Sequence, residues 1–590
     1  MKQFFKFMFA SMAGFFLIFI VIFFILMGMI MSVATLTKKE VVIVSKNTVL
    51  HLKFDQAIPD RSSNNPFDNF DFSSMKSNDA PGLNDILDNI RKAKADENIK
   101  GIYLDLSTVP AGVATLDEIR NALLDFKSSG KFIISYGEDY TQKAYYLATV
   151  ADKIYLNPTG LIDFKGINGE IMFFKGLLEK LDVNVQIIRH GKFKSAVEPF
   201  LYDKMSEANK LQTLKYLTSI WDHLLDGISS GRKISKNDLT AIADGLKIRA
   251  AEDAVKYKLA DKLMYKDEIL AELRTRLGIG ANDNISVMSM SKYIDAPDKT
   301  KKFVKSHDKI AVIYALGEIQ SGVGSDKIIG SERISEAIRK ARLDSTVKAI
   351  VLRVNSPGGS ALASDVIWRE VVLAKKVKPV VASMGDVAAS GGYYISCAAS
   401  KIVADENTIT GSIGVFGIVP NLKGLYNNKL GITFDNVKTN THADFGTTSR
   451  AMSDEEKGIF QVGVENIYHT FISHVAEGRH MTTDAVDSIG QGRVWSGADA
   501  IKIGLIDKFG GLDTAIHLAA RLAKISDYRI TSLPEQKDKF EQIIESLKGG
   551  SDDVLLKKEL GDAYDYYMYI ENIKNMKGVQ AVMPYQIIIE

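Results

Sequence analysis

A degenerate internal repeat constrains the fold of this chain more than any other feature of its sequence. When Tyr136 is placed on Met384, the run YGEDYTQKAYYLATVADKI lies over MGDVAASGGYYISCAASKI without a gap. Further along, AAEDAVKYKLAD echoes SGADAIKIGLID at nearly the same spacing. Matches at two separated points and nearly one offset are difficult to obtain by chance. The sequence therefore predicts a duplicated domain.

Each copy alternates strand-like and helix-like runs in the same order. The first copy reads KGIYLDL, LDEIRNALLDFKSSG and KFIISYG, and the second reads KAIVLRV, ASDVIWREVVLAKK and KPVVASMG. This order is typical of an α/β fold with crossover connections. We expect a membrane anchor at residues 1–40, a first repeat at 41–290, a second repeat at 291–525, and a C-terminal extension at 526–590 whose role no motif suggests.

The N-terminal segment is apolar over an unusual length. No charged residue lies between Lys6 and Lys38, and the run far exceeds the ~20 residues that cross a bilayer. A signal peptide cleaved near Ser32–Ala34 is the competing interpretation. An h-region of ~7–15 residues is much shorter than this run, which favours a retained transmembrane helix. Lysines flank both ends, so charge does not settle the orientation.

Composition excludes some classes of function. Lys and Arg total 74 against 72 Asp and Glu, so the chain lacks the global basic field that points to nucleic acid, and we expect no nucleic-acid partner. The single cysteine, Cys397, excludes an intramolecular disulfide and a Cys-based metal site. We expect Cys397 to be a small buried residue, and we expect no cofactor or metal.

The two copies differ where chemistry could reside. Ser390, in the run DVAASGGYYISCAAS, corresponds to Gln142, so the first copy lacks a hydroxyl at this position. QIIRHGKFKSAVEPF of the first copy aligns approximately with NVKTNTHADFG of the second, which places Lys194 against Ala443. The second copy thus carries a serine without a lysine, and the first a lysine without a serine.

A Ser–Lys dyad divided between two like domains would leave this complementary pattern. A serine hydroxyl is a weak nucleophile until a base removes its proton, and lysine can replace histidine as that base. The lysine must be neutral, which a pocket with little water favours. Phe193 and Val197 near Lys194 allow such a pocket. Without the repeat, a surface lysine like Lys192 would be the simpler interpretation.

An acyl-transfer site also needs donors for an oxyanion. The turn Pro357–Gly359 could expose backbone N–H groups beside the N–H of Gly391, although a plain turn fits this motif as well. Ser412, between glycines in TITGSIGVFG, could orient the lysine amine by a hydrogen bond. Turn packing is an equally plausible role for Ser412.

These motifs together resemble a known family. NSPGGSALAS, GDVAASGGYYISCAASKIVADENTITGSIGVFG, GKFKSAVEPF and GRVWSGADAIKIGLIDKFGGLDTAI are similar to the signal peptide peptidase SppA (protease IV) family in its long two-domain form, from the anchor to about residue 525. The resemblance implies an α/β fold of tandem ClpP/crotonase-like (ββα superhelix) domains after one transmembrane helix. It also implies a serine endopeptidase that degrades signal peptides after their release.

The resemblance assigns roles and surroundings as well. It implies Ser390 as nucleophile, Lys194 as general base, Gly359 and Gly391 as oxyanion donors, and Ser412 as the residue that orients the lysine. It implies a homo-oligomeric ring or bowl, a tetramer by likeness, anchored in the bacterial inner membrane with its catalytic domains outside the cytoplasm. Subunit number and preference at the cleaved bond are not fixed by the sequence.

Three alternatives remain open at this point. A crotonase-like acyl-CoA enzyme would use the same fold and paired glycine N–H groups, and a non-catalytic membrane scaffold would need neither Ser390 nor Lys194. A Ser–His–Asp arrangement using His442 and Asp444 is a mechanistic rival that rests on their proximity to the expected position of the base.

Overall fold

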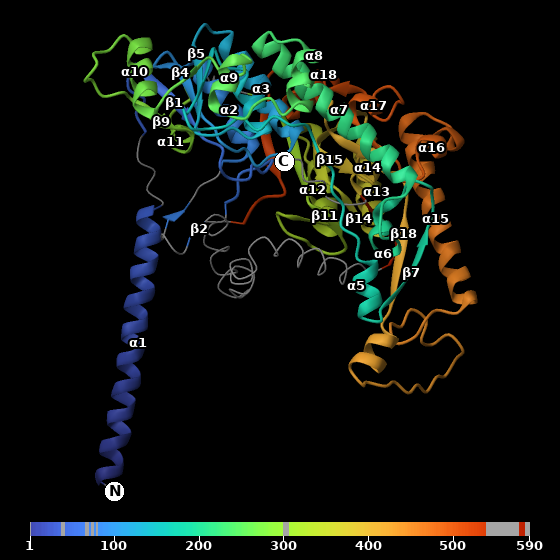
Figure 1. The fold of residues 1–590 in the computed structure, drawn as a ribbon. Helices are drawn as coiled ribbons and strands as arrows, with labels where there is room; N and C mark the ends of the chain where they lie inside the picture. The colour runs from blue at the N-terminus through green and yellow to red at the C-terminus, as the bar shows by residue number, and fades with distance from the viewer. Residues whose placement is uncertain are drawn as a thin grey trace.

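The computed structural model describes residues 2–36, 42–64, 70–71, 76–77, 81–298, 306–537 and 578–583. Helix α1 (Lys2–Leu36) projects from the body of the molecule (Figure 1). Its segment Gln3–Phe24 has a mean hydropathy of 2.6, and none of it is buried in the protein. By length and composition this segment can cross a membrane.

Each half is built around a parallel sheet, and the two sheets have the same strand order. The first runs β9-β1-β4-β5-β6-β8 and the second β21-β10-β13-β15-β16-β20, and the paired strands in both are parallel. The strands of the first sheet are β1 (Thr48–Leu52), β4 (Ile99–Asp105), β5 (Phe132–Gly137), β6 (Lys153–Leu156), β8 (Lys262–Leu263) and β9 (Val287–Ser289). Those of the second are β10 (Lys309–Leu316), β13 (Val347–Ser356), β15 (Val380–Ala389), β16 (Lys401–Ala404), β20 (Lys508–Phe509) and β21 (Arg529–Leu533). In addition, β17 (Ile409–Gly411) pairs with β15, and β19 (Val494–Ser496) pairs with β17.

Helices cover these sheets in a matching order. Those of the first half are α2 (Leu83–Ala95), α3 (Val113–Lys127), α4 (Gln142–Ala148), α5 (Lys175–Lys180), α6 (Glu198–Leu201), α7 (Glu207–Arg232), α8 (Lys236–Asp244), α9 (Ala251–Lys256), α10 (Lys266–Leu277) and α11 (Met290–Ile294). Those of the second are α12 (Ser331–Leu343), α13 (Ala361–Lys375), α14 (Gly391–Ser396), α15 (Asp454–Arg479), α16 (Thr483–Ile489), α17 (Gly497–Ala500) and α18 (Leu512–Leu522). Strands buried on both faces, such as VKAIVLRVNS in β13, are rich in β-branched residues because helices enclose a parallel sheet.

The duplication extends to individual contacts. The long helices α7 and α15 each span 26 residues, start after a serine whose side chain caps the first turn, and end at a residue with left-handed backbone. Arg232 pairs with Asp261 at 2.9 Å, and Arg479 pairs with Asp507 at 2.9 Å. The predicted α/β duplication is therefore confirmed by both topology and side-chain contacts.

A third, smaller sheet joins the two halves. Its order is β12-β11-β14-β22-β18-β7. In Figure 1, β7 from the first half lies beside β18 from the second, and the two strands pair antiparallel over six residues each. Its strands are β7 (Asn184–Arg189), β11 (Glu318–Gln320), β12 (Ile328–Gly330), β14 (Gly358–Ser360), β18 (Phe416–Asn421) and β22 (Gln580–Val582). The pairing of β7 with β18 carries the segment after β7 into the second half.

Buried polar contacts fix the two halves against each other. Arg353 of β13 is fully buried and pairs with Asp60 at 2.5 Å and Glu118 at 2.7 Å, both from the first half. Asp386 of β15 accepts hydrogen bonds from the backbone N–H and the hydroxyl of Thr115 at 2.9 and 2.7 Å, so it caps the first turn of α3. These contacts hold the register in which side chains of one half meet those of the other.

The domain boundaries themselves stay predictions. Strand β21 lies past residue 525 and pairs with β10, so the second sheet uses part of the segment that the sequence leaves as an extension. Residues 538–577 and 584–590 of that segment lie outside the described residues.

Candidate active site

Ser390 stands at the sharp turn between strand β15 and helix α14. Its backbone has φ 54° and ψ −113°, a region that costs a non-glycine residue free energy and is retained where the surroundings enforce it. Its N–H donates to the carbonyl of Gly411 at 2.8 Å, and its side chain is fully buried. A strand-to-helix turn of this kind presents the hydroxyl at the edge of a sheet.

Lys194 follows β7 and reaches Ser390 from the other half. Its Nζ lies 2.8 Å from Oγ of Ser390, 3.1 Å from Oγ of Ser412 and 3.2 Å from the carbonyl oxygen of Ser412. The side chain is fully buried. Burial lowers the pKa of Lys194 well below its ordinary value, because removal from water disfavours the ammonium form.

The surroundings of the Lys194 amine match a neutral group. A neutral amine has two N–H donors and one lone pair, and the two oxygens of Ser412 can accept both donors. The lone pair is then left for the hydroxyl of Ser390. An ammonium ion would instead be buried with no carboxylate among the hydrogen-bond partners of its Nζ, which is costly. The arrangement can thus take a proton from the Ser390 hydroxyl.

A glycine loop of the second half, which was not predicted from the sequence, holds the backbone of Lys194. The N–H of Phe193 donates to the carbonyl of Gln491 at 2.9 Å, and the N–H of Gly492 donates to the carbonyl of Ile413 at 2.7 Å. Gly492 has φ +82°, and a Cβ there would lie 2.6 Å from the backbone of Lys194. The run GQGR was the available signal, since closely spaced glycines mark close backbone approach.

The two predicted oxyanion glycines lie close together. A Cβ on Gly391 would be 3.1 Å from the backbone nitrogen of Gly359. The preceding Gly358 has φ +105°, and a Cβ there would be 2.7 Å from the nitrogen of Gly391. The turn after β13 therefore brings the predicted donors to one place beside Ser390, and only a glycine at 358 leaves room for it.

The turn of the first half that corresponds to the Ser390 turn carries Gln142 and has a different role. The Gln142 amide donates to the carbonyl of Gly166 at 2.8 Å, and its oxygen accepts the N–H groups of Lys165 and Gly166 at 3.0 and 2.8 Å. Ser390 makes the equivalent contact, from Oγ to the carbonyl of Gly414, at 3.4 Å. Gln142 thus supports a loop where the second half carries a hydroxyl.

The structure does not bring His442 and Asp444 to Ser390. The His442 side chain is 44% exposed and lies 3.8 Å from Glu455. Asp444 pairs with Arg450 at 2.7 Å and with Lys438 at 2.6 Å. The Ser–His–Asp alternative therefore lacks the geometry that it requires.

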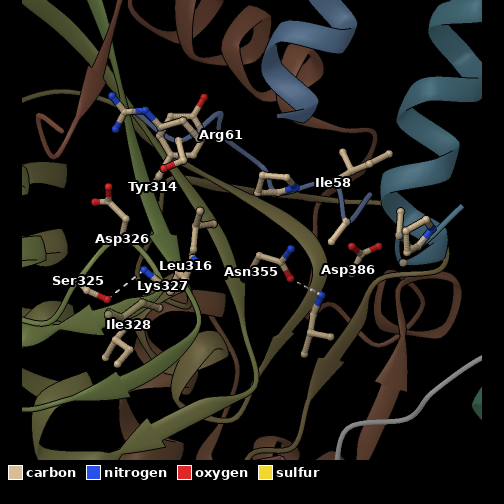
Figure 2. A pocket seen from close by; sticks show the side chains of 18 of the residues that line it. Ile58, Arg61, Tyr314, Leu316, Ser325, Asp326, Lys327, Ile328, Asn355 and Asp386 are labelled. Atoms are coloured by element: carbon tan, nitrogen blue, oxygen red, sulfur yellow. Dashed lines mark hydrogen bonds between the residues drawn. The ribbon is translucent and has the colours of Figure 1, made fainter. Parts of the chain in front are cut away.

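A cavity of about 640 Å³ opens between the two halves. Figure 2 shows Ile58, Arg61, Tyr314, Leu316, Asn355 and Asp386 around it. Met583, one residue beyond β22, also lines this cavity. The cavity therefore adjoins the small sheet that carries Gly359.

Comparison with known proteins identifies the family. The model of peptidase family S49 matches residues 125–280 and again residues 373–526. The chain belongs to peptidase family S49. One match falls in each half, so the duplication is a duplication of the S49 domain, and the predicted fold class and the predicted likeness to protease IV are both confirmed. The chain is a serine protease of this family.

Named relatives span most of the chain. Protease 4 of Salmonella typhi is 39% identical over 79% of this chain and 76% of its own length. Protease 4 of Haemophilus influenzae is 37% identical over 74% and 72%, and the chloroplastic serine protease SPPA of Arabidopsis thaliana is 33% identical over 85% and 75%. Among solved structures, a mutant ClpP1 from Listeria monocytogenes is 15% identical over 35% of this chain and 94% of its own, with a TM-score of 0.24. So low a score carries no argument about the site.

Proposed function

We propose that this protease hydrolyses peptide bonds through a dyad of Ser390 and Lys194, with an acyl-enzyme intermediate. The observation that carries the proposal is the 2.8 Å separation of the Lys194 Nζ and the Ser390 Oγ in a fully buried setting. Lys194 acts as general base and Ser390 as nucleophile. Ser412 orients the lysine amine, and the N–H groups of Gly359 and Gly391 receive the oxyanion.

The proposed steps use one proton carrier throughout. Neutral Lys194 takes the hydroxyl proton as Oγ of Ser390 attacks the carbonyl carbon, and it then gives that proton to the departing amine. Water next attacks the ester with Lys194 again as base, which releases the new carboxyl end. The lowered pKa of Lys194 supports this role, because only the amine form can accept a proton.

The proposed substrates are cleaved signal peptides and other apolar peptides. We further propose that α1 anchors the chain in a bacterial inner membrane, with the catalytic domains on the extracytoplasmic side as a homo-oligomer. The apolar helix and the likeness to Protease 4 of two bacteria support this proposal. An anchored protease would meet signal peptides where they remain after release, in the plane of the membrane.

The test is hydrolysis of an apolar signal-peptide sequence by the full chain in detergent. Wild type, Ser390→Ala, Lys194→Ala and His442→Ala are compared, with Lys192→Ala as the matched control because Lys192 is exposed. We expect loss of at least ~10³-fold for the first two variants and unchanged rates for the last two. Wild-type rates in Lys194→Ala would refute the dyad. A polar peptide of equal length, cleaved equally well, would refute the substrate class.

A further inference from the structure

Gln212 of helix α7 lies beside the segment that carries Lys194, and it is only 2% exposed. Its amide nitrogen donates to the carbonyl of Phe193 at 3.2 Å and to Oγ of Ser195 at 2.8 Å. These two acceptors belong to the residues directly before and after Lys194. One buried amide thus holds the chain on both sides of the lysine.

The other end of the same amide reaches the second half. Its oxygen accepts the backbone N–H of Val494 in β19 at 3.3 Å. Val494 lies opposite Gly411 of β17 in the antiparallel ladder, and the carbonyl of Gly411 accepts the N–H of Ser390 at 2.8 Å. The Gln212 amide therefore connects the lysine segment to the strands that hold the backbone of Ser390.

The partners of the amide fix its orientation. A backbone N–H can only donate and a backbone carbonyl can only accept, so the oxygen must face Val494 and the nitrogen must face Phe193. A carboxylate of the same shape would set two acceptors against each other at Phe193. A thioether of similar length would leave both backbone groups without this partner. The position therefore requires a group that donates and accepts at one end.

Further buried polar contacts hold Gln212 itself. Asn209, one turn earlier on α7, accepts from the Gln212 amide at 3.2 Å and donates to the carboxylate of Glu198 at 2.9 Å. That carboxylate also accepts the hydroxyl and the N–H of Ser206, the cap of α7, at 2.6 and 3.1 Å. Because Glu198, Asn209 and Gln212 are each at most 2% exposed, these contacts form with little water, where a satisfied network is rigid.

The matching helix of the second half carries a different residue at this position. Helix α7 starts after Ser206 and α15 after Ser453. The sixth residue after the cap is Gln212 in α7 and Ile459 in α15, and Ile459 is 52% exposed. The Ser453 cap bonds instead with Glu456 of its own helix. The buried amide thus occurs in the copy that carries the lysine, as expected of a residue that serves that lysine.

We propose that Gln212 is a positioning residue of this protease, which holds the Lys194 amine against the Ser390 hydroxyl by tying the lysine segment to β19. The inference rests on the proposed Ser–Lys dyad. The amide acts through the residues on either side of Lys194 and through Val494. Without it, the segment loosens, the 2.8 Å contact between Nζ and Oγ forms less often, and water reaches the amine.

The experiment measures kcat and KM of the full chain in detergent on an apolar peptide from pH 6 to 10. In Gln212→Met, which keeps the length of the side chain, we expect kcat to fall at least ~10-fold at pH 7 while KM stays unchanged. Water that reaches Lys194 raises its pKa toward the ordinary value, so the rise of kcat with pH should move to higher pH. Gln212→Glu should move it in the same direction, because a nearby carboxylate favours the ammonium form.

The matched control is Gln142→Met in the same half. The Gln142 amide is 3% exposed and also bonds the backbone through both its nitrogen and its oxygen. Both Met variants should lose stability to denaturant, but only Gln212→Met should change kcat and its pH dependence. Ser195→Ala, a milder change that removes one acceptor of the amide, should lower kcat and shift the profile to a smaller degree, and it serves if Gln212→Met does not fold.

The outcomes separate this inference from the dyad. Wild-type kcat and pH dependence in Gln212→Met, or in Ser195→Ala if that variant alone folds, would overturn the positioning role and leave the dyad standing. A fall in kcat without a shift in the pH profile, or an equal fall in Gln142→Met, would reduce Gln212 to a structural residue and also overturn the inference. Wild-type rates in Lys194→Ala would instead overturn the proposed function.

Discussion

The two halves of this protease share a frame and differ at one turn. Gln142 and Ser390 occupy the same strand-to-helix turn, and each side chain reaches the carbonyl of an equivalent glycine, Gly166 or Gly414. In the first half the turn supports a loop. In the second half it carries the Ser390 hydroxyl beside Lys194, which comes from the first half. The comparison teaches that a duplicated fold can lose the site in one copy while it keeps the contact geometry.

The sharpest test of this comparison is to remove the hydroxyl from the turn of the second half and place one on the turn of the first half. In Ser390→Ala with Gln142→Ser, the first half carries a hydroxyl, while Lys194 stays beside position 390 of the second half. We expect hydrolysis to remain at least ~10³-fold below wild type. The measurement is kcat/KM on an apolar peptide, with Gln142→Ser alone as the control for folding. Restored hydrolysis would show that the first half retains a complete site.

The second-largest expected effect is on the free energy of unfolding, through the buried contacts between the two halves. Arg353→Met leaves Asp60 and Glu118 buried without their partner, and breaking a buried pair costs about 3–5 kcal/mol. The matched control is Arg91→Met, because the exposed pair of Arg91 with Asp513 also links the halves and should contribute less than ~1 kcal/mol. Denaturant unfolding measures both, and equal losses would contradict the account.

The positioning of the lysine is expected to have a smaller effect on rate. Ser412→Ala removes one acceptor of the Lys194 amine but leaves the carbonyl of Ser412 in place. We expect kcat to fall about 10-fold, the equivalent of one neutral hydrogen bond, while KM stays unchanged. Ser412→Thr keeps the hydroxyl and should restore part of the rate. A change in KM alone would contradict a positioning role.

The smallest expected effect is the loss of one buried tyrosine hydrogen bond, and its cost in unfolding free energy should be equal in the two halves. The Tyr145 hydroxyl donates to the carbonyl of Leu259 at 2.9 Å, and that of Tyr393 to the carbonyl of Leu505 at 2.9 Å. Each Tyr→Phe change should lower the free energy of unfolding by about 1 kcal/mol. Unfolding of the two variants, followed by circular dichroism, checks this. A clear difference between them would limit how far the duplication extends.

Sequence reasoning reached the fold and the candidate dyad because the repeat aligns without a gap around Ser390. That alignment also exposed the position where Gln142 stands. The loop around Gly492, the ion pairs of Arg353 and the addition of β22 to the small sheet were not predicted. Each depends on residues far apart in the chain that meet through packing, and only the loop around Gly492 leaves a local signal, its closely spaced glycines.

The central claim is that Lys194 of the first half activates Ser390 of the second. The most direct test is the rate at which a fluorophosphonate labels Ser390 between pH 6 and 10. Burial lowers the pKa of Lys194, so the neutral base persists below the range of an ordinary lysine. Labelling should rise with pH through that lowered pKa and then level off, in wild type and Lys192→Ala alike. Lys194→Ala should lose this rise and label at least ~10³-fold more slowly. Wild-type labelling rates and pH dependence in Lys194→Ala would contradict the account.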